Sequence, residues 1–373
     1  MNTNRTGANP HKQATELTES APSSPLSQLT TPTTRPSASS YAKVFLGIGL
    51  TLSGSGCTPS GQPLGITNRE NTSFRATSER YKGASSFGAT AATLTLAESI
   101  GTDQLTKINN DFGKSCGSGQ VAAMLTLLAQ KQGNTISGVN EMFQQSRGTS
   151  ISAANLCAAV TISGKSIQEI NQLFDKSIPW DSEAASILVL AAACGNRPIE
   201  EINGLYKQNP ETGLPGALLV LGSVISGKSM ADMAVMYSQA QSLQSTCASE
   251  LTLLAAVYKT PMQEINQLWK EASGSSEGSI LLVQSALAAR KPITTANHFY
   301  GASPSWSEMG SAILVLTSAS KELAEREHGT GLIPLIYSRP VGKSRHTYFV
   351  PLVVPGSAGF EGKSLPLAPT GTP

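Results

Sequence analysis

The sequence lacks a strong imbalance of charge. Its 373 residues include 27 Lys and Arg against 25 Asp and Glu, a formal net charge of +2 at neutral pH. Proteins that bind nucleic acid or an anionic membrane surface usually carry a strongly basic face. The charge balance therefore predicts neither nucleic acid nor a membrane surface as the partner.

Residues that hold metals or act as nucleophiles are also sparse. The five cysteines show no CxxC spacing and no neighbouring histidine; they are Cys57, Cys116, Cys157, Cys194 and Cys247. We therefore expect no metal site, no thioredoxin-like motif and no cofactor. Cys157 and Cys194 lie in apolar runs, so we interpret them as buried thiols that pack like small hydrophobic side chains.

No apolar run reaches the roughly 18 residues of a membrane-spanning helix, and residues 1–43 have almost no large apolar side chains. This leader is rich in Ser, Thr and Pro and cannot bury enough surface to offset the entropy of an ordered chain. We expect a disordered leader over residues 1–43 and a disordered tail over residues 356–373.

A short apolar segment follows the leader at residues 44–57. The run from Val44 to Leu52 is preceded by a lysine and followed by four small residues and Cys57. A positive residue, a short apolar core and a small-residue site are parts of a secretory signal. The segment resembles the lipobox of bacterial lipoproteins, although Gly54 stands where that family usually has Leu. The resemblance makes Cys57 a candidate for lipidation, the only membrane attachment expected.

Residues 58–88 are polar and contain Gly and Ser, which is typical of a flexible tether. An equally weighted alternative is that residues 1–43 resemble the leader of a type III secreted effector, with a destination inside a host cell. A plain disordered leader on a cytosolic protein is the third interpretation. The sequence leaves the choice between envelope lipoprotein and secreted effector open.

A short motif recurs through the middle of the chain: an aliphatic residue, usually followed by Asn, with an aromatic residue four positions after the aliphatic one. Successive aromatic residues are 31 or 32 positions apart; they are Phe112, Phe143, Phe174, Tyr206, Tyr237, Trp269 and Tyr300. A leucine precedes each aliphatic residue by 14 positions, and an eighth follows; these are Leu94, Leu125, Leu156, Leu188, Leu219, Leu251, Leu282 and Leu314. A fixed period of this length indicates a repeat architecture.

Each repeat contains two helical patterns. The leucine lies in a run that is apolar on nearly all sides, which predicts a buried helix. Ile167, Ile170 and Phe174 illustrate the second pattern, one amphipathic face at i, i+3 and i+7. Turns such as 163–166 join the two, with Gly closing the first helix and Ser or Pro opening the second. We predict an all-α fold, an α-solenoid of about seven αα-hairpins over residues 89–322.

The pattern ends before the segment 323–355, which contains two β-prone runs. We expect this segment to form a C-terminal cap, as a β-hairpin on the last repeat.

The repeat itself, through Leu156, Gly164, Leu173 and Phe174, resembles the αα-hairpin of pentatricopeptide and tetratricopeptide repeats. The period is shorter than in either family. The resemblance implies the stacking of hairpins, and we do not carry over RNA binding from it.

The recurrent asparagine is the candidate site of the repeat region. It occurs in six of seven repeats, as Asn109, Asn140, Asn171, Asn203, Asn266 and Asn297. These amides could bind an extended ligand. They could instead form a ladder that satisfies backbone groups of neighbouring turns, and we favour the ladder because most side-chain hydrogen bonds go to backbone or water.

Residues 222–229 match the phosphate-binding loop pattern GxxxxGKS. That motif needs a strand before it and a helix after it. Here it coincides with a junction between two helices of a repeat, so we expect no nucleotide site.

Without a catalytic constellation, we expect a non-enzymatic scaffold that binds a protein or peptide partner in the groove between stacked hairpins. It would belong to the bacterial envelope or be a secreted, virulence-type effector. The first alternative is an RNA-binding helical-repeat protein. The second is an enzyme with a site in the linkers or the C-terminal segment.

Overall fold

The computed structural model describes residues 68–101, 103–130, 134–327, 330–341, 343–355 and 365–366, which belong to the unit Gln62–Pro373. In this part of the chain, sixteen helices follow one another and an antiparallel β-hairpin ends the array. The predicted all-α solenoid with a short C-terminal β segment is therefore confirmed.

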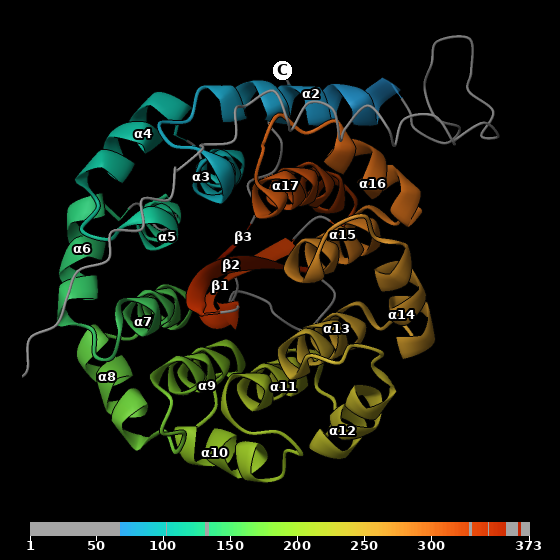
Figure 1. The fold of residues 1–373 in the computed structure, drawn as a ribbon. Helices are drawn as coiled ribbons and strands as arrows, with labels where there is room; N and C mark the ends of the chain where they lie inside the picture. The colour runs from blue at the N-terminus through green and yellow to red at the C-terminus, as the bar shows by residue number, and fades with distance from the viewer. Residues whose placement is uncertain are drawn as a thin grey trace, which may run out of the picture. The chain divides into compact units, whose positions relative to one another are not determined.

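The first helix of each repeat lies on the inside of the array (Figure 1). These inner helices are α3 (Gly88–Ile100), α5 (Gly119–Ala129), α7 (Ser150–Ser163), α9 (Ser182–Gly195), α11 (Gly213–Ser226), α13 (Ser245–Tyr258), α15 (Ser276–Ala289) and α17 (Glu308–Glu327). The eight recurring leucines all lie on these helices and have no exposed surface. Burying a leucine stabilises the fold by about 1.5–3 kcal/mol, so these positions anchor the stack.

The outer helices carry the recurring motif. They are α2 (Asn68–Lys82), α4 (Leu105–Lys114), α6 (Ile136–Gln145), α8 (Ile167–Lys176), α10 (Ile199–Lys207), α12 (Met230–Gln239), α14 (Met262–Glu271) and α16 (Ile293–Gly301). In α8, Ile167 and Ile170 are buried while most other side chains are at least partly exposed. One apolar face is thus enough to hold each outer helix on the inner layer.

The turns between inner and outer helices follow the predicted chemistry. Gly164 and Gly227 end α7 and α11 in the left-handed conformation, with φ of 70° and 73°. Ser166 opens α8 with a capping box that uses Glu169. Pro198 precedes the first residue of α10 in the corresponding place. Proline suits this position because it has no backbone N–H, and an N–H here would find no partner within the helix.

The array closes into a ring, which the repeat pattern did not predict. The last inner helix, α17, packs against the first, α3, and also against α2. Figure 1 shows the inner helices in a circle with the outer helices around them. Helix α2 fills the outer position beside α17, so residues 68–82 belong to the folded ring and are not the expected flexible tether. Residues 58–67 lie outside the described residues, as do the leader and the apolar segment.

Helix α2 was missed because it is polar and has few apolar residues. Phe74, Thr77 and Tyr81 are its buried face, and Phe74 stacks on Phe299 of α16 with ring centroids 4.7 Å apart. The Tyr81 hydroxyl accepts a hydrogen bond from the Gly88 amide at 3.1 Å. Two aromatic side chains therefore join α2 to α16, near the end of the array, and to the first residue of α3.

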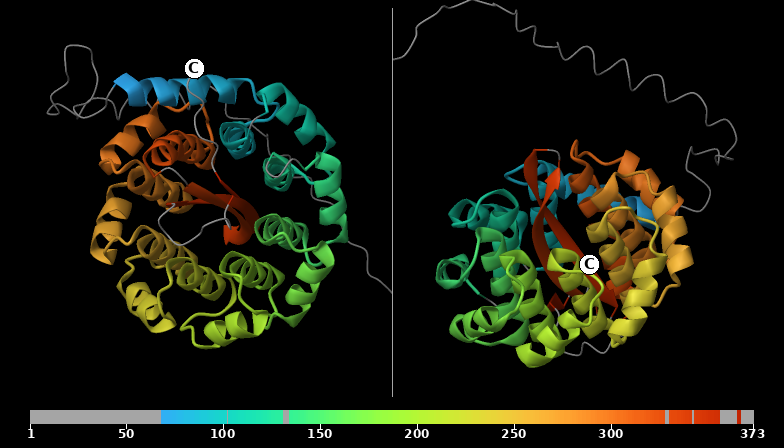
Figure 2. Two further views of the ribbon diagram at one scale, coloured as in Figure 1. Left: turned by 180° about the vertical axis from the view of Figure 1, so that it is seen from behind. Right: turned by 60° about the horizontal axis from the view of Figure 1, so that its bottom comes forward.

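The C-terminal hairpin was predicted correctly as a hairpin but wrongly as an end cap. Strands β1 (Thr330–Val341) and β2 (Ser344–Pro355) pair over their full lengths, with Tyr337 opposite Tyr348. A two-residue strand, β3 (Leu365–Pro366), pairs with the other edge of β1. The hairpin contacts α5, α7, α9, α13, α15 and α17 and runs through the middle of the ring (Figure 2). The hairpin therefore fills the interior of the closed ring.

The hairpin also shows how the inner helices are oriented. Ser338 and Arg339, near its tip, contact the first turns of α9 and α13, while Val353, near its base, contacts Tyr258 at the end of α13. The inner helices therefore begin at one end of the ring and finish at the other. We name the first end the linker face, since it carries the outer-to-inner linkers, and the second the turn face, since it carries the inner-to-outer turns.

Candidate functional site

Each predicted asparagine joins its own outer helix to the end of the preceding one. In Asn171 the amide nitrogen donates to the Gln145 carbonyl at 2.8 Å, and the amide oxygen accepts from the Arg147 N–H at 3.1 Å. The same pair of bonds recurs at Asn109, Asn140, Asn203, Asn266 and Asn297. Both functions of the amide are used within the protein, as in the backbone ladder that the sequence favoured.

The one repeat without the asparagine has a different linker. Ala234 takes its place on α12, and the linker before α11 is held by other side chains. Asn209 donates to the Gly216 carbonyl at 2.8 Å, and Tyr237 donates to the Glu211 carboxylate at 2.7 Å. Polar groups of this linker therefore find partners without the ladder.

A buried polar cluster fixes the hairpin inside the ring. The Glu183 carboxylate accepts from the Ser338 N–H at 2.6 Å and the Ser338 hydroxyl at 2.7 Å. Arg345 adds an ion pair to Glu183 at 3.3 Å, and Arg339 pairs with Glu277. Charge-assisted bonds of this kind satisfy carboxylates that would otherwise be costly to bury.

Glu250 lies in the same cluster and accepts a hydrogen bond from the Tyr337 hydroxyl. Burial raises the pKa of Glu250 to about 7, although Tyr337 and Arg339 act in the opposite direction. Its second carboxylate oxygen has no hydrogen-bond partner. The carboxyl group is therefore partly protonated at neutral pH.

Asn155 and Gln284 complete the contacts with the hairpin. Asn155 donates to the Ile336 carbonyl at 2.8 Å and accepts from the Ile336 N–H at 3.1 Å. Gln284 donates to the Pro351 carbonyl at 3.0 Å. Asn155 and Gln284 are single polar residues within apolar helical runs, and such residues indicate that a polar group lies opposite them. The sequence analysis missed this signal because the repeat pattern does not use single polar residues.

The buried thiols pack as expected. Cys157 and Cys194 are buried, and burial raises the pKa of each to about 12. A neutral thiol is a poor nucleophile and a poor metal ligand. Within the described residues, no three or more His, Cys, Asp or Glu side chains are grouped to hold a metal ion.

The phosphate-loop pattern at residues 222–229 forms a helix junction. It spans the end of α11, the left-handed Gly227 and the first cap of α12. Gly222 packs closely against α12, because a Cβ there would come within 2.8 Å of the Met233 side chain. The Ser229 hydroxyl accepts from the Asp232 N–H. Helix packing and capping therefore account for these residues.

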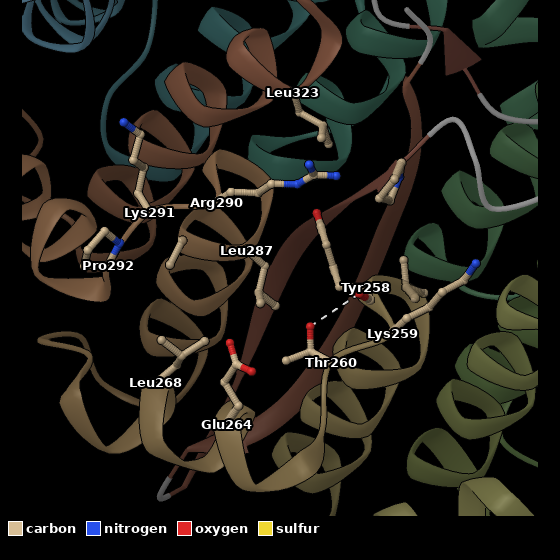
Figure 3. Close-up of a pocket in the computed structure, with 13 residues that line it drawn as sticks. Tyr258, Lys259, Thr260, Glu264, Leu268, Leu287, Arg290, Lys291, Pro292 and Leu323 are labelled. Atoms are coloured by element: carbon tan, nitrogen blue, oxygen red, sulfur yellow. Dashed lines mark hydrogen bonds between the residues drawn. The ribbon is translucent and has the colours of Figure 1, made fainter. Parts of the chain in front are cut away.

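Inside the ring, the hairpin packs against the inner helices α5, α7, α9, α13, α15 and α17. A pocket of about 610 Å³ lies on the turn face between α13, α14 and α15 (Figure 3). Lys259, Arg290 and Lys291 line it together with Glu264. Sequence reasoning missed this pocket because its residues are far apart in the chain.

The linker face carries exposed apolar side chains. Trp180 is 95% exposed, Trp306 77% and Phe87 69%, and Ile178 and Leu243 are also exposed. All five lie in linkers that precede an inner helix. Phe87 and Trp306 stack with ring centroids 6.0 Å apart. Two of the three tryptophans of the chain are thus presented to solvent on one face.

The candidate lipidation site, Cys57, lies outside the described residues. Within those residues, none of the helices combines the length and apolar character needed to cross a membrane.

The fold and these surfaces define a class of protein: a closed α/α ring of helical-hairpin repeats with its own β-hairpin in the centre. No family model matches the chain, and no curated protein matches it either. The resemblance to pentatricopeptide and tetratricopeptide repeats therefore stays a prediction.

Proposed function

We propose that the chain is a non-enzymatic scaffold that binds a protein partner through its linker face. The observation that carries this proposal is the set of exposed side chains formed by Phe87, Ile178, Trp180, Leu243 and Trp306. Tryptophan is enriched among the residues that dominate protein interfaces, and it is costly to leave in water.

The positions of these side chains suit one broad partner surface. Phe87 and Trp306 lie where α17 meets α3, Trp180 precedes α9, and Leu243 precedes α13. These places are spread around the ring in Figure 1, and they share the linker face. A partner that spans the face can contact all three of these places, which favours a folded protein over a short peptide.

The chemistry of the interior supports a binding role over a catalytic one. The carboxylates Glu183 and Glu277 bond to the hairpin, and Glu250 bonds to Tyr337. Cys157 and Cys194 are buried with raised pKa values. These groups have structural partners within the ring.

The proposal includes the place where the partner is found. The leader and the apolar segment 44–57 are typical of an exported chain, so we propose that the partner lies in the bacterial envelope or in a host cell. The full-length protein, immobilised through its C-terminus, would be used to capture partners from both sources, and each captured protein would then be purified and titrated.

The decisive variant combines Trp180→Ser and Trp306→Ser. We expect it to bind the purified partner at least roughly tenfold more weakly than the unchanged protein, since single interface tryptophans often contribute 2 kcal/mol or more. Val235→Ser is the control, because Val235 is also exposed but lies on α12, outside the linkers. Equal affinity in all three proteins, or no saturable partner at all, would refute the proposal.

A further inference from the structure

The hairpin is longer than the ring that surrounds it, and it extends past the linker face. Strands β1 and β2 have 12 residues each, which corresponds to about 40 Å. The inner helix α9, with 14 residues, is only about 21 Å long. Ser338 bonds to Glu183 in the first turn of α9, whereas Pro340 and Ser344–Thr347 are exposed. We name these exposed residues the projecting tip.

Inside the ring, side chains of the inner helices bond to the outer edges of both strands. The hairpin residues whose backbone groups receive these bonds are Ile336, Ser338, Pro351 and Val353. They are even-numbered in β1 and odd-numbered in β2. Residues of an antiparallel pair alternate between bonding to the paired strand and facing outward. By this alternation, the backbone groups of Pro340, Arg345 and Thr347 also face outward.

The two edges of the projecting tip differ. On β1, Pro340 has no N–H to offer, and proline of this kind protects an edge from pairing with another strand. On β2, Arg345 and Thr347 are exposed and each presents an outward N–H and carbonyl. The Arg345 side chain reaches across to β1, where it donates to the Ser338 hydroxyl at 3.0 Å. The β2 edge of the tip is therefore open.

The open edge lies on the side of the ring formed by α13 and α15. Tyr258 of α13 and Gln284 of α15 donate to the same edge of β2 further inside the ring. The linkers on this side carry two exposed apolar side chains, Leu243 before α13 and Trp306 before α17. A strand added to β2 would reach the linker face there, so that the protein to which it belongs could pack on these side chains.

From this geometry we infer that the β2 edge at Arg345 and Thr347 binds an extended segment of the partner protein, which adds a strand to the hairpin. The inference rests on the proposed function, because it states how a partner is held at the linker face. The outward N–H and carbonyl groups repeat at the spacing of a strand, and the backbone of another strand matches both.

The charge of the tip favours a partner over a second copy of the chain. Residues 339–347 include Arg339, Lys343 and Arg345 and no acidic residue. Two copies paired through β2 would place Lys343 and Arg345 of one beside those of the other, and like charges on paired strands are destabilising. The chemistry expected of the segment is therefore an uncharged or acidic strand.

The probe is a random peptide library displayed on phage and selected against the full-length protein. We expect it to yield peptides that bind saturably when synthesised and titrated. Their sequences should alternate in polarity, because successive side chains of a strand point to opposite sides. Sedimentation of the unchanged protein, with and without peptide, would show whether the chain pairs with itself instead.

The decisive variant is Thr347→Pro, which removes an outward N–H and places a proline ring on the open edge. The bonds between β1 and β2 should survive, because the neighbouring residues make them. We expect the selected peptides to bind this variant roughly tenfold more weakly or worse, since main-chain hydrogen bonds supply much of the affinity of an added strand. Thr347→Ala is the matched control, because it keeps the N–H, and it should bind nearly as tightly as the unchanged protein.

Amide exchange in the unchanged protein gives a measurement that does not depend on the folding of a variant. Bound peptide should slow the exchange of the Arg345 and Thr347 amides, which face outward, and leave His346, which faces β1, unaffected.

Four results would overturn the inference: no saturable peptide, equal affinity for Thr347→Pro, unchanged exchange at both amides, or a dimer of the unchanged protein that Thr347→Pro dissociates. A partner protein that loses affinity on combining Trp180→Ser and Trp306→Ser, but not on Thr347→Pro, would overturn this inference alone. The proposed function would then stand.

Discussion

At the scale of the residue, the asparagine column shows how a short motif stabilises a long array. Each amide satisfies an N–H and a carbonyl at the end of the preceding outer helix, where the helix leaves backbone groups without partners. The column places the same side chain at the same joint in six repeats. Its chemistry could be predicted, since Asn offers both a donor and an acceptor, but its partners could not be identified from the sequence.

Asn266→Ala should lower the free energy of unfolding by about 1–3 kcal/mol, because two backbone groups lose their partners in a nearly buried site. Asn266 is 5% exposed and bonds to the Gln239 carbonyl and the Gln241 N–H. Denaturant unfolding would measure the change. Gln263→Ala, an exposed position on the same helix, should change stability by less than about 0.5 kcal/mol; a comparable loss there would contradict the assignment.

Lys259→Gly should raise stability by roughly 1 kcal/mol, because glycine adopts a φ of 54° without the cost that a Cβ imposes. Thermal unfolding would show it. Gly227→Ala is the reverse change at the equivalent turn and should destabilise by a similar amount. An unchanged or lowered melting temperature of Lys259→Gly would contradict this account of the turn.

At the scale of the element, the hairpin was partly predictable. Two apolar β-prone runs separated by a short polar stretch are a local signal, and the structure confirms them as β1 and β2. Their position inside the ring could not be predicted from the local sequence. It depends on Asn155, Glu183, Glu250, Glu277 and Gln284, which come from four different inner helices.

Glu250 should make the stability of the ring depend on pH. Its folded pKa of about 7 lies above the ordinary value of 4.5, so the folded state holds the proton more tightly than the unfolded state. The corresponding stability is fully present below about pH 4.5 and is lost as the pH rises toward 7. The shift corresponds to about 3 kcal/mol.

Glu250→Gln tests this dependence, because the amide keeps an acceptor for Tyr337 but cannot ionise. We expect the difference in unfolding free energy between variant and unchanged protein to shift in favour of the variant between pH 4.5 and 7. Parallel pH profiles for the two proteins would show that Glu250 is not the group responsible. Glu264→Gln, an exposed carboxyl on α14, serves as the control substitution.

At the scale of the whole molecule, α2 adds to the closure of the ring by packing beside α17 and α3. Phe74→Ala should destabilise the ring by about 3–5 kcal/mol, because the side chain is 4% exposed and stacks on Phe299. Hydrogen exchange should show the greatest loss of protection in α2, α3 and α17. A uniform loss in all helices would instead mean that the ring unfolds as one unit without a preferred opening.

The export hypothesis concerns residues 1–57 and is tested on the protein from its native cells. Intact-mass spectrometry distinguishes the two predicted forms. A chain that begins at an acylated Cys57 would identify an envelope lipoprotein, while an intact chain in the culture supernatant would identify a secreted effector. An intact chain found only in the cytoplasm would contradict both.

The sequence by itself determined the repeat, its two helices, their turns and the hairpin. Each is specified by residues within one period: the buried leucines, the left-handed glycines and the amide at each joint. Only the tertiary structure decided that the array closes, that α2 completes it, that the hairpin fills its centre and that Lys259 and Arg290 share a pocket. Closure is the sum of small rotations between successive repeats, and it brings together residues that are distant in the chain. A local pattern records neither the rotation nor the contacts that follow from it.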